Sequence, residues 1–205
     1  MTLDEALGRC PLIAILRGIT PAEAATVGGA LFDAGLRIIE VPLNSPEPMR
    51  SIATLAALLG DRALVGAGTV LSAGEVHAVR AAGGRLIVMP HGDLAVVRAA
   101  KAAGLWCVPG IATPTEAFAV LSEGADALKL FPAELMSPAV VKALRAVLPK
   151  ATRLIPVGGI SASNIPAYRA AGADAFGVGS TLYSPGKPAA EVARDAAALV
   201  LAVSR

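Results

Sequence analysis

Short apolar runs alternate with longer alanine-rich segments along the whole chain. Eight such runs are bounded by Gly, Pro or Thr, a pattern typical of strands buried on both faces of a parallel sheet. The predicted strands cover Leu12–Leu16, Arg37–Val41, Ala63–Ala67, Leu86–Met89, Leu105–Val108, Ala127–Phe131, Leu154–Val157 and Ala175–Val178.

The segments between these runs have helical composition and carry signals for where helices begin and end. Pro21 after Thr20, Ser72, and the sequence Thr113-Pro114-Thr115-Glu116 predict helix starts. A short helix is also predicted near Thr2–Arg9. Glycines that follow alanine-rich runs predict left-handed C-caps at Gly35, Gly83, Gly104, Gly124 and Gly172.

Eight strand–helix units recur about every 20 to 27 residues. This repetition predicts a single (β/α)8 barrel domain, of the TIM-barrel type, over residues 1–205, with a short N-terminal helix. A doubly wound open sheet is the alternative. In a barrel, the chemistry lies at the carboxyl ends of the strands, and phosphate binds after the seventh and eighth strands.

The composition narrows the function classes. Of 205 residues, 55% are hydrophobic and only 3% aromatic, so the core is expected to be aliphatic. Eighteen basic against 16 acidic residues give a net charge of +2 without a basic run, which argues against nucleic-acid binding. No uninterrupted apolar stretch of about 18 residues and no signal-peptide pattern occur, so a soluble cytoplasmic protein is expected.

Lys129 lies within the sixth predicted strand, in Ala-Leu-Lys-Leu-Phe-Pro, whereas the other lysines lie in helical or loop segments. A charged amine inside a barrel is unfavourable unless it is paired or neutralised. Such a lysine loses its proton toward neutral pH and becomes a nucleophile for ketones. We therefore predict a Schiff-base lysine. A structural ion pair with an acid of a neighbouring strand is the alternative.

Glu40 is the acid best placed to interact with Lys129. It lies at the end of the second predicted strand, in Arg-Ile-Ile-Glu-Val-Pro. It alternates with Ile38, so its side chain should point into the barrel as that of Lys129 does. A carboxylate near an amine suits iminium chemistry, in which protons move at carbon and oxygen. Simple neutralisation of the Lys129 charge is the alternative role.

Two further features predict an anion-binding site. Arg17 ends the first predicted strand, where a guanidinium can hold a carboxylate or phosphate, unless it only reaches into solvent. Val157-Gly158-Gly159-Ile160 follows the seventh strand, and Gly177-Val178-Gly179-Ser180 closes the eighth. Glycines there let backbone N–H groups approach an anion, with Ser180 expected to begin a helix.

Other common sites find no support in the sequence. His77 and His91 do not form a metal-ligand pattern, and no Cys/His cluster, hydrolase nucleophile elbow or P-loop occurs, so we predict no metal and no cofactor. His77 is expected at the surface, and His91 is left open as a minor substrate contact. Cys10 and Cys107 are expected to be buried free thiols.

With these residues in view, the chain resembles the 2-keto-3-deoxy-6-phosphogluconate/galactonate aldolase family. The resemblance runs from Pro11 to about Gly186 and rests on several motifs together, namely PLIAILRGITP, RIIEVPLNSPEP, GAGTVL, the PG-x-x-TPTEAF run, LKLFPAE, PVGGI and FGVGS-x-LY. It implies a metal-independent class I aldolase on a (β/α)8 barrel, commonly a homotrimer.

The resemblance also implies roles for individual residues. Lys129 matches the Schiff-base lysine and Glu40 the general acid/base. The residues that line the pocket match Thr69, Pro90 and Phe131. The phosphate site matches Gly158, Gly159, Gly179 and Ser180.

Two positions resemble the galactonate branch. Asn44 stands where phosphogluconate enzymes carry an arginine, the arginine instead being Arg17, and Val157 stands where those enzymes tend to have threonine. The implied reaction cleaves 2-dehydro-3-deoxy-6-phosphogalactonate to pyruvate and D-glyceraldehyde 3-phosphate, with the phosphogluconate epimer as the alternative substrate. A phosphosugar isomerase and a non-catalytic phosphometabolite-binding barrel are the two rival classes.

Overall fold

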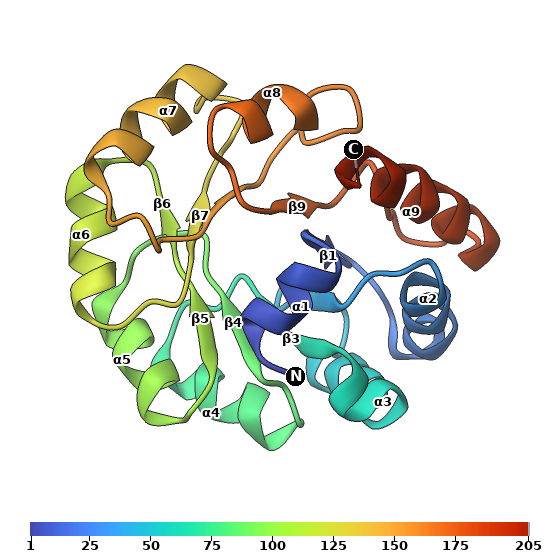
Figure 1. Ribbon diagram of the computed structural model, residues 1–205. Helices are drawn as coiled ribbons and strands as arrows, with labels where there is room; N and C mark the ends of the chain where they lie inside the picture. Colours follow the sequence, from blue (N-terminus) through green and yellow to red (C-terminus); the bar gives the residue numbers. More distant parts are fainter. Residues whose placement is uncertain (205) are drawn as a thin grey trace.

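Parallel strands surrounded by helices form this α/β fold (Figure 1). The computed structural model describes residues 1–204, so the predicted domain end at residue 205 lies outside the described residues. The strands are β1 (Leu12–Ile15), β2 (Ile38–Pro42), β3 (Leu64–Gly68), β4 (Leu86–Val88), β5 (Trp106–Val108), β6 (Gly110–Ile111), β7 (Leu128–Leu130), β8 (Leu154–Pro156) and β9 (Phe176–Val178).

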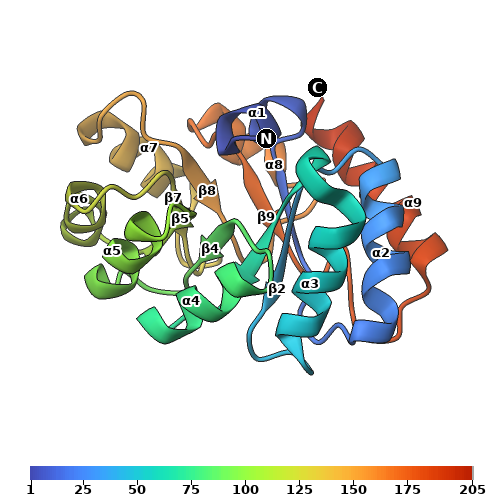
Figure 2. The same ribbon diagram turned by 90° about the horizontal axis from the view of Figure 1, so that it is seen from below.

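The helices follow the strands in alternation after an N-terminal helix. They are α1 (Leu3–Arg9), α2 (Pro21–Asp33), α3 (Pro48–Leu59), the 3-10 turn η1 (Gly60–Arg62), α4 (Ala73–Ala81), α5 (Leu94–Ala102), α6 (Pro114–Ser122), α7 (Pro138–Val147), α8 (Ile165–Ala170) and α9 (Ala189–Val203). Figure 2 shows α1 lying across one end of the strands.

The strands form two parallel sheets that meet at two seams. The larger sheet has the order β5-β4-β3-β2-β1-β9, and the smaller has the order β6-β7-β8. At one seam a parallel bridge joins Val157, directly after β8, to Gly177 of β9. At the other seam only Pro109 separates β5 from β6. Proline has no N–H to donate, which accounts for the interruption of the strand there.

Side chains alternate between two apolar clusters. Ile13, Ile15 and Ile38 belong to an inner cluster that also contains Leu3 and Leu7 of α1. Residues at the intervening positions, such as Leu12 and Ile39, belong to a larger outer cluster beneath the helices, which is consistent with strands covered on both faces. The inner cluster and the α1 residues packed into it fill the end of the strands that α1 covers.

The predicted α/β class and strand positions are confirmed, with two differences. All eight predicted runs contain a strand, and β6 is an additional short strand beyond the fifth run. Glu40 lies in the middle of β2 rather than at its end, since β2 continues to Pro42. Strands β1 to β5 lie side by side in sequence order, and β1 pairs with β9. This order excludes the doubly wound alternative, which requires a reversal of strand order.

The helix boundaries agree with the sequence signals. Thr2, Thr20, Ser72 and Thr113 each form a capping box with a glutamate three residues later. All five glycines predicted to end helices have positive φ, for example 107° at Gly35. Local capping therefore fixes where these helices begin or end.

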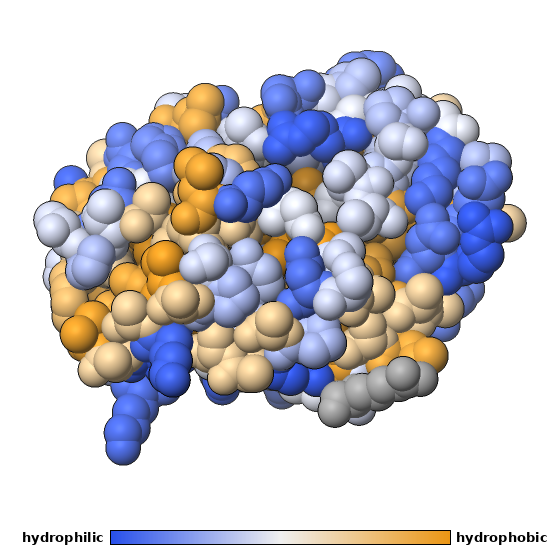
Figure 3. Space-filling model, turned by 90° about the horizontal axis from the view of Figure 1, so that it is seen from above, coloured by the Kyte–Doolittle hydropathy of each residue, from blue (hydrophilic) through white to orange (hydrophobic). Residues whose placement is uncertain are grey.

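The outer surface mixes apolar and hydrophilic residues. Figure 3 shows both kinds interspersed over the face that carries α7, α8 and α9. No helix within residues 1–204 is long and apolar enough to cross a membrane. Cys10 and Cys107 are buried free thiols, as predicted.

We expect Gly110→Ala to lower the free energy of unfolding by about 1–3 kcal/mol, because a Cβ would overlap the backbone carbonyl of Pro90. Gly29→Ala is the matched control. Gly29 lies inside α2 with open space around it, so alanine should add up to about 1 kcal/mol. Urea unfolding of both variants checks this prediction. Equal stability of the two would contradict the close contact between β6 and the β4 end.

Candidate active site

Glu40 is a buried carboxylate on β2. Its side chain is 2% exposed, and in β2 it pairs with Ile15 on one side and Gly66 on the other. Its Oε2 atom is fully buried and has no hydrogen-bond partner within residues 1–204. Burial raises the pKa of Glu40 to about 7, although the positive charges of Lys129 and Arg17 oppose the shift.

Glycines on β3 provide the room for this carboxylate. A Cβ at Gly68 would overlap both carboxylate oxygens of Glu40, and a Cβ at Gly66 would overlap the Leu86 carbonyl group. The side chain of Glu40 therefore occupies space that only a glycine leaves free, which holds it in one place.

Lys129 is a buried amine on β7. Its neighbours Leu128 and Leu130 belong to the outer cluster, so Lys129 points to the opposite, inner side, where it is 6% exposed. Its Nζ lies 4.5 Å from the centroid of the Phe131 ring. Burial lowers the pKa of Lys129, an effect that the Glu40 charge opposes and the Arg17 charge reinforces.

The two groups influence each other without touching. Each appears among the charges that shift the other's pKa, yet no ion pair within 4.0 Å joins them in the described part of the chain. A simple structural ion pair, the alternative raised by the sequence, would place nitrogen and oxygen in direct contact. The interaction between Lys129 and Glu40 is therefore one of charge acting at a distance rather than a direct contact.

A cavity of about 470 Å³ opens beside this pair. Phe131 and Ile15 connect the two, since Phe131 contacts the Lys129 amine and Ile15 pairs with Glu40. The cavity is lined by Ile15, Arg17, Gly18, Phe131, Glu134, Val157, Gly158, Gly159, Ile160, Gly177, Gly179, Ser180, Thr181, Tyr183, Ser184 and Pro185. It thus brings together seven predicted site residues: Arg17, Phe131, Val157, Gly158, Gly159, Gly179 and Ser180.

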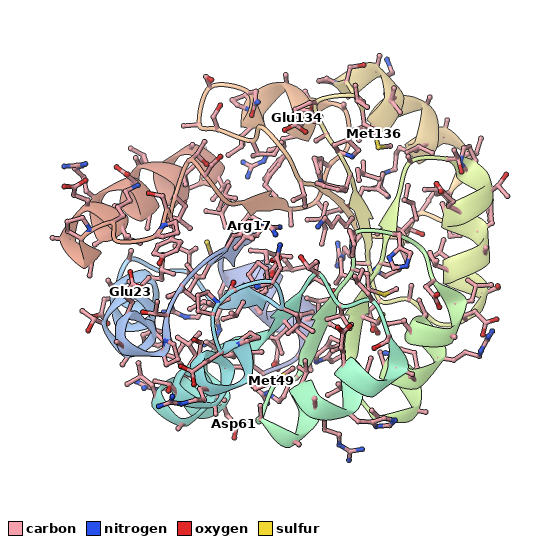
Figure 4. All side chains as sticks on the ribbon, turned by 180° about the vertical axis from the view of Figure 1, so that it is seen from behind. Arg17, Glu23, Met49, Asp61, Glu134 and Met136 are labelled. Atoms are coloured by element: carbon pink, nitrogen blue, oxygen red, sulfur yellow. The ribbon has the colours of Figure 1, made fainter. Side chains whose placement is uncertain are left out.

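The cavity lies at the end of the strands opposite α1. Figure 4 looks onto this end, with Arg17 near the centre of the view and Glu134, which also lines the cavity, nearer the edge. Arg17 follows β1, and its Nη1 donates a hydrogen bond of 2.8 Å to Asn44 Oδ1. Arg17 is exposed and also lines the cavity, so it does not only reach into bulk solvent.

Thr69 and Pro90 do not line this cavity but follow the neighbouring strands β3 and β4. Thr69 has a φ of 55°, unusual for a β-branched residue, and directly follows the Gly68 that packs against Glu40. Pro90 presents its carbonyl group to Gly110, the residue that pairs with Lys129. Both lie next to the buried pair, and their contact with a substrate remains a prediction.

The glycine site is built from turns. Gly158 and Gly159 have φ values of 114° and 60°, so their backbone lies in a region that other residues rarely adopt. The predicted helix start at Ser180 is wrong. Leu182 and Tyr183 donate to the Gly179 carbonyl in a single turn, and α9 begins only at Ala189. The intervening Ser-Pro-Gly-Lys-Pro sequence cannot continue a helix.

Glu134 is a cavity residue that was not predicted from the sequence. This residue follows β7, and its carboxylate occupies the space where a Cβ of Gly158 would lie, so an acidic group stands at the glycine site. A charged residue just after the strand that carries Lys129 was the available signal. The contact of Asn44 with Arg17 and the contact of Gly68 with Glu40 were likewise not predicted.

The histidines lie apart from the cavity lining. His77 and His91 are both exposed, and neither lines the cavity. Among residues 1–204, no group of three or more His, Cys, Asp or Glu side chains could hold a metal ion.

Comparison with known proteins assigns the chain to a family. The family model described as "Aldolase: KDPG and KHG aldolase" matches residues 3–194. The chain belongs to the KDPG and KHG aldolase family. The resemblance drawn from the sequence motifs is therefore confirmed, and this membership favours an aldolase over the isomerase and the non-catalytic binding protein.

Two relatives place the chain within the KDPG and KHG aldolase family. It is 47% identical over 192 residues to a Rhizobium meliloti (strain 1021) protein named "Probable 2-dehydro-3-deoxy-6-phosphogalactonate aldolase", covering 94% of this chain and 91% of the relative. It is 46% identical over 194 residues to the "2-dehydro-3-deoxy-6-phosphogalactonate aldolase" of Escherichia coli (strain K12), covering 95% of each. A solved structure described as "Native KDPGal structure" matches with a TM-score of 0.93 and 46% identity over 95% of this chain and 94% of that one.

Proposed function

We propose that this protein is a class I aldolase that cleaves 2-dehydro-3-deoxy-6-phosphogalactonate to pyruvate and D-glyceraldehyde 3-phosphate through a Schiff base on Lys129. The observation that carries the proposal is that the buried amine of Lys129 and the buried carboxylate of Glu40 shift each other's pKa beside a glycine-lined cavity. Relatives named for this activity, at 46% and 47% identity, support the choice of substrate.

The reaction begins at the Lys129 amine, which attacks the C2 ketone carbon of the substrate. Loss of water from this adduct gives an iminium ion. A lowered lysine pKa favours the first step because the neutral amine is the nucleophile. The ring of Phe131, 4.5 Å from the nitrogen, stabilises positive charge at that position by a cation–π interaction.

Cleavage then uses the iminium nitrogen as the electron acceptor. The C3–C4 bond breaks, its electron pair forms an enamine, and the C4 hydroxyl loses its proton to Glu40, directly or through one water. Glu40 next returns a proton to C3, and hydrolysis of the iminium releases pyruvate. A carboxyl with a pKa of about 7 is suited to both transfers near neutral pH.

Arg17 and the glycine turns bind the two ends of the substrate. The Arg17 guanidinium holds the carboxylate next to the ketone, and the backbone at Gly158, Gly159, Gly179 and Ser180 holds the phosphate. Val157 lines the cavity between them. Thr69 and Pro90 contact the substrate beside the Lys129–Glu40 pair. Binding the remote phosphate aligns C3 and C4 with Lys129 and Glu40 and thereby raises the rate. The reaction needs no metal or cofactor.

We further propose that the two sheets form one closed (β/α)8 barrel domain, with β5 and β6 as one interrupted strand. The Val157–Gly177 bridge and the single residue between β5 and β6 support this closure. We also propose a cytoplasmic homotrimer, as the family resemblance implies. Sedimentation equilibrium measures the assembly directly.

Borohydride reduction in the presence of pyruvate should add one reduced pyruvyl group to Lys129, located by peptide mass spectrometry. Lys129→Arg keeps the positive charge but cannot form the imine. It should therefore not be labelled, and its kcat should fall at least about 1000-fold. The exposed Lys142 provides the control, since Lys142→Ala should retain label and activity. Normal cleavage by folded Lys129→Arg protein would overturn the proposal.

Cleavage should depend on the protonation state of Glu40. Because its pKa is about 7, kcat/KM should fall as the pH drops below 7, where the protonated carboxyl cannot accept the C4 hydroxyl proton. In Glu40→Gln this acidic limb should disappear and the rate should be low throughout, while pyruvate still labels Lys129. Glu134→Gln alters an exposed cavity carboxylate and should keep the limb. An unchanged limb in Glu40→Gln would remove the assigned role.

The two C4 epimers should react at different rates, with kcat/KM higher for the galactonate substrate. Val157 lines the cavity without a hydroxyl, so Val157→Thr should move the ratio toward the gluconate epimer by about tenfold. Val157→Ala, which adds no hydroxyl, is the matched control and should not produce that shift. A higher kcat/KM for the gluconate epimer in the unaltered protein would reverse the substrate assignment.

A further inference from the structure

Two successive residues after β1 are tied to two successive residues after β2. Arg17 Nη1 donates to Asn44 Oδ1 at 2.8 Å, and the Gly18 N–H donates to Ser45 Oγ at 2.9 Å. Ser45 is 7% exposed, so the second bond is anchored in the interior. The β2–α3 connection thereby fixes the β1–α2 connection at the edge of the cavity.

Arg17 differs from several other arginines of this protein in the partner it uses. Arg85, Arg98 and Arg145 each form an ion pair with an acidic side chain. Within residues 1–204, Arg17 forms no such pair, and its side-chain partner is the neutral amide of Asn44. Its positive charge is therefore not cancelled, and it acts on both Glu40 and Lys129.

An amide oxygen suits this task better than the obvious alternatives. It accepts one of the five N–H groups of the guanidinium and leaves the others free for a two-pronged contact with a carboxylate. An aspartate at position 44 would neutralise the guanidinium and compete with an anionic ligand. An alanine at position 44 would leave the Arg17 side chain without this partner and free to adopt many rotamers.

We propose that Asn44 is a positioning residue that aims the Arg17 guanidinium at the substrate carboxylate, and so sets the affinity for the keto-acid end of the substrate. This inference rests on the proposed function. Glu40 and Asn44 lie four residues apart in the same segment. That segment therefore carries the proposed proton-transfer group and also positions Arg17, which binds the substrate carboxylate.

A double-mutant cycle tests the proposal in the intact protein. Asn44→Ala should raise KM for cleavage about tenfold and change kcat less than threefold, because binding loses a pre-aimed contact while the Lys129–Glu40 pair stays in place. In an Arg17→Ala background the same change should alter KM less than twofold, since Asn44 then has nothing to position.

Asn44→Asp provides a second readout that a purely structural role would not move. Its carboxylate should cancel the Arg17 charge, so KM should rise more than in Asn44→Ala and the acidic limb of the kcat/KM profile should move to higher pH. Ser45→Ala removes the neighbouring bond between the same loops and keeps the Arg17 partner, so it should raise KM less than Asn44→Ala does.

The outcomes separate this inference from the proposed function. If pyruvate and borohydride do not label Lys129 in the unaltered protein, the proposed function fails. If Lys129 is labelled, but Asn44→Ala raises KM equally with and without Arg17 or leaves KM unchanged, the positioning role is overturned. Labelling of Lys129 together with a KM effect that depends on Arg17 supports both.

Discussion

The structure depends on an amine and a carboxylate held close to each other in an apolar interior. Lys129 and Glu40 come from strands on different sheets, and each is almost fully removed from solvent. Burial alone would neutralise both groups, and the attraction between their charges works against this. The proposed reaction relies on this balance, in which Lys129 attacks the substrate and Glu40 exchanges protons.

The side chains of such a buried pair also need space, and glycines on the neighbouring strands provide that space. Gly68 leaves room for the Glu40 carboxylate, and Gly110 pairs with Lys129 on the adjacent strand. Gly158 and Gly159 open the backbone where the cavity meets the β8 end. Because each of these glycines lies at or near the carboxyl end of a strand, the same parallel arrangement that builds the core also gathers the site.

Regular alternation made much of the fold and the buried pair predictable from the sequence. Lys129 lies between Leu128 and Leu130, and Glu40 lies two residues after Ile38. Both interrupt an otherwise apolar pattern, so both could be identified from the sequence as candidate site residues. The break at Pro109, the turn at Ser180 and the approach of Glu134 to Gly158 were not predictable, because they depend on how connections pack in three dimensions. The bond between Arg17 and Asn44 joins positions 27 residues apart, and no local signal announces it.

The helix α1 has a consequence for how molecules would pass in the proposed reaction. Leu3, Ala6 and Leu7 pack into the inner cluster and cover the amino ends of the strands. In the proposed reaction the cavity on the opposite side is therefore the route for both entry and exit. In the proposed reaction the three-carbon acid stays covalently attached while the phosphorylated aldehyde is free. The aldehyde must therefore depart first, and pyruvate leaves through the same opening afterwards.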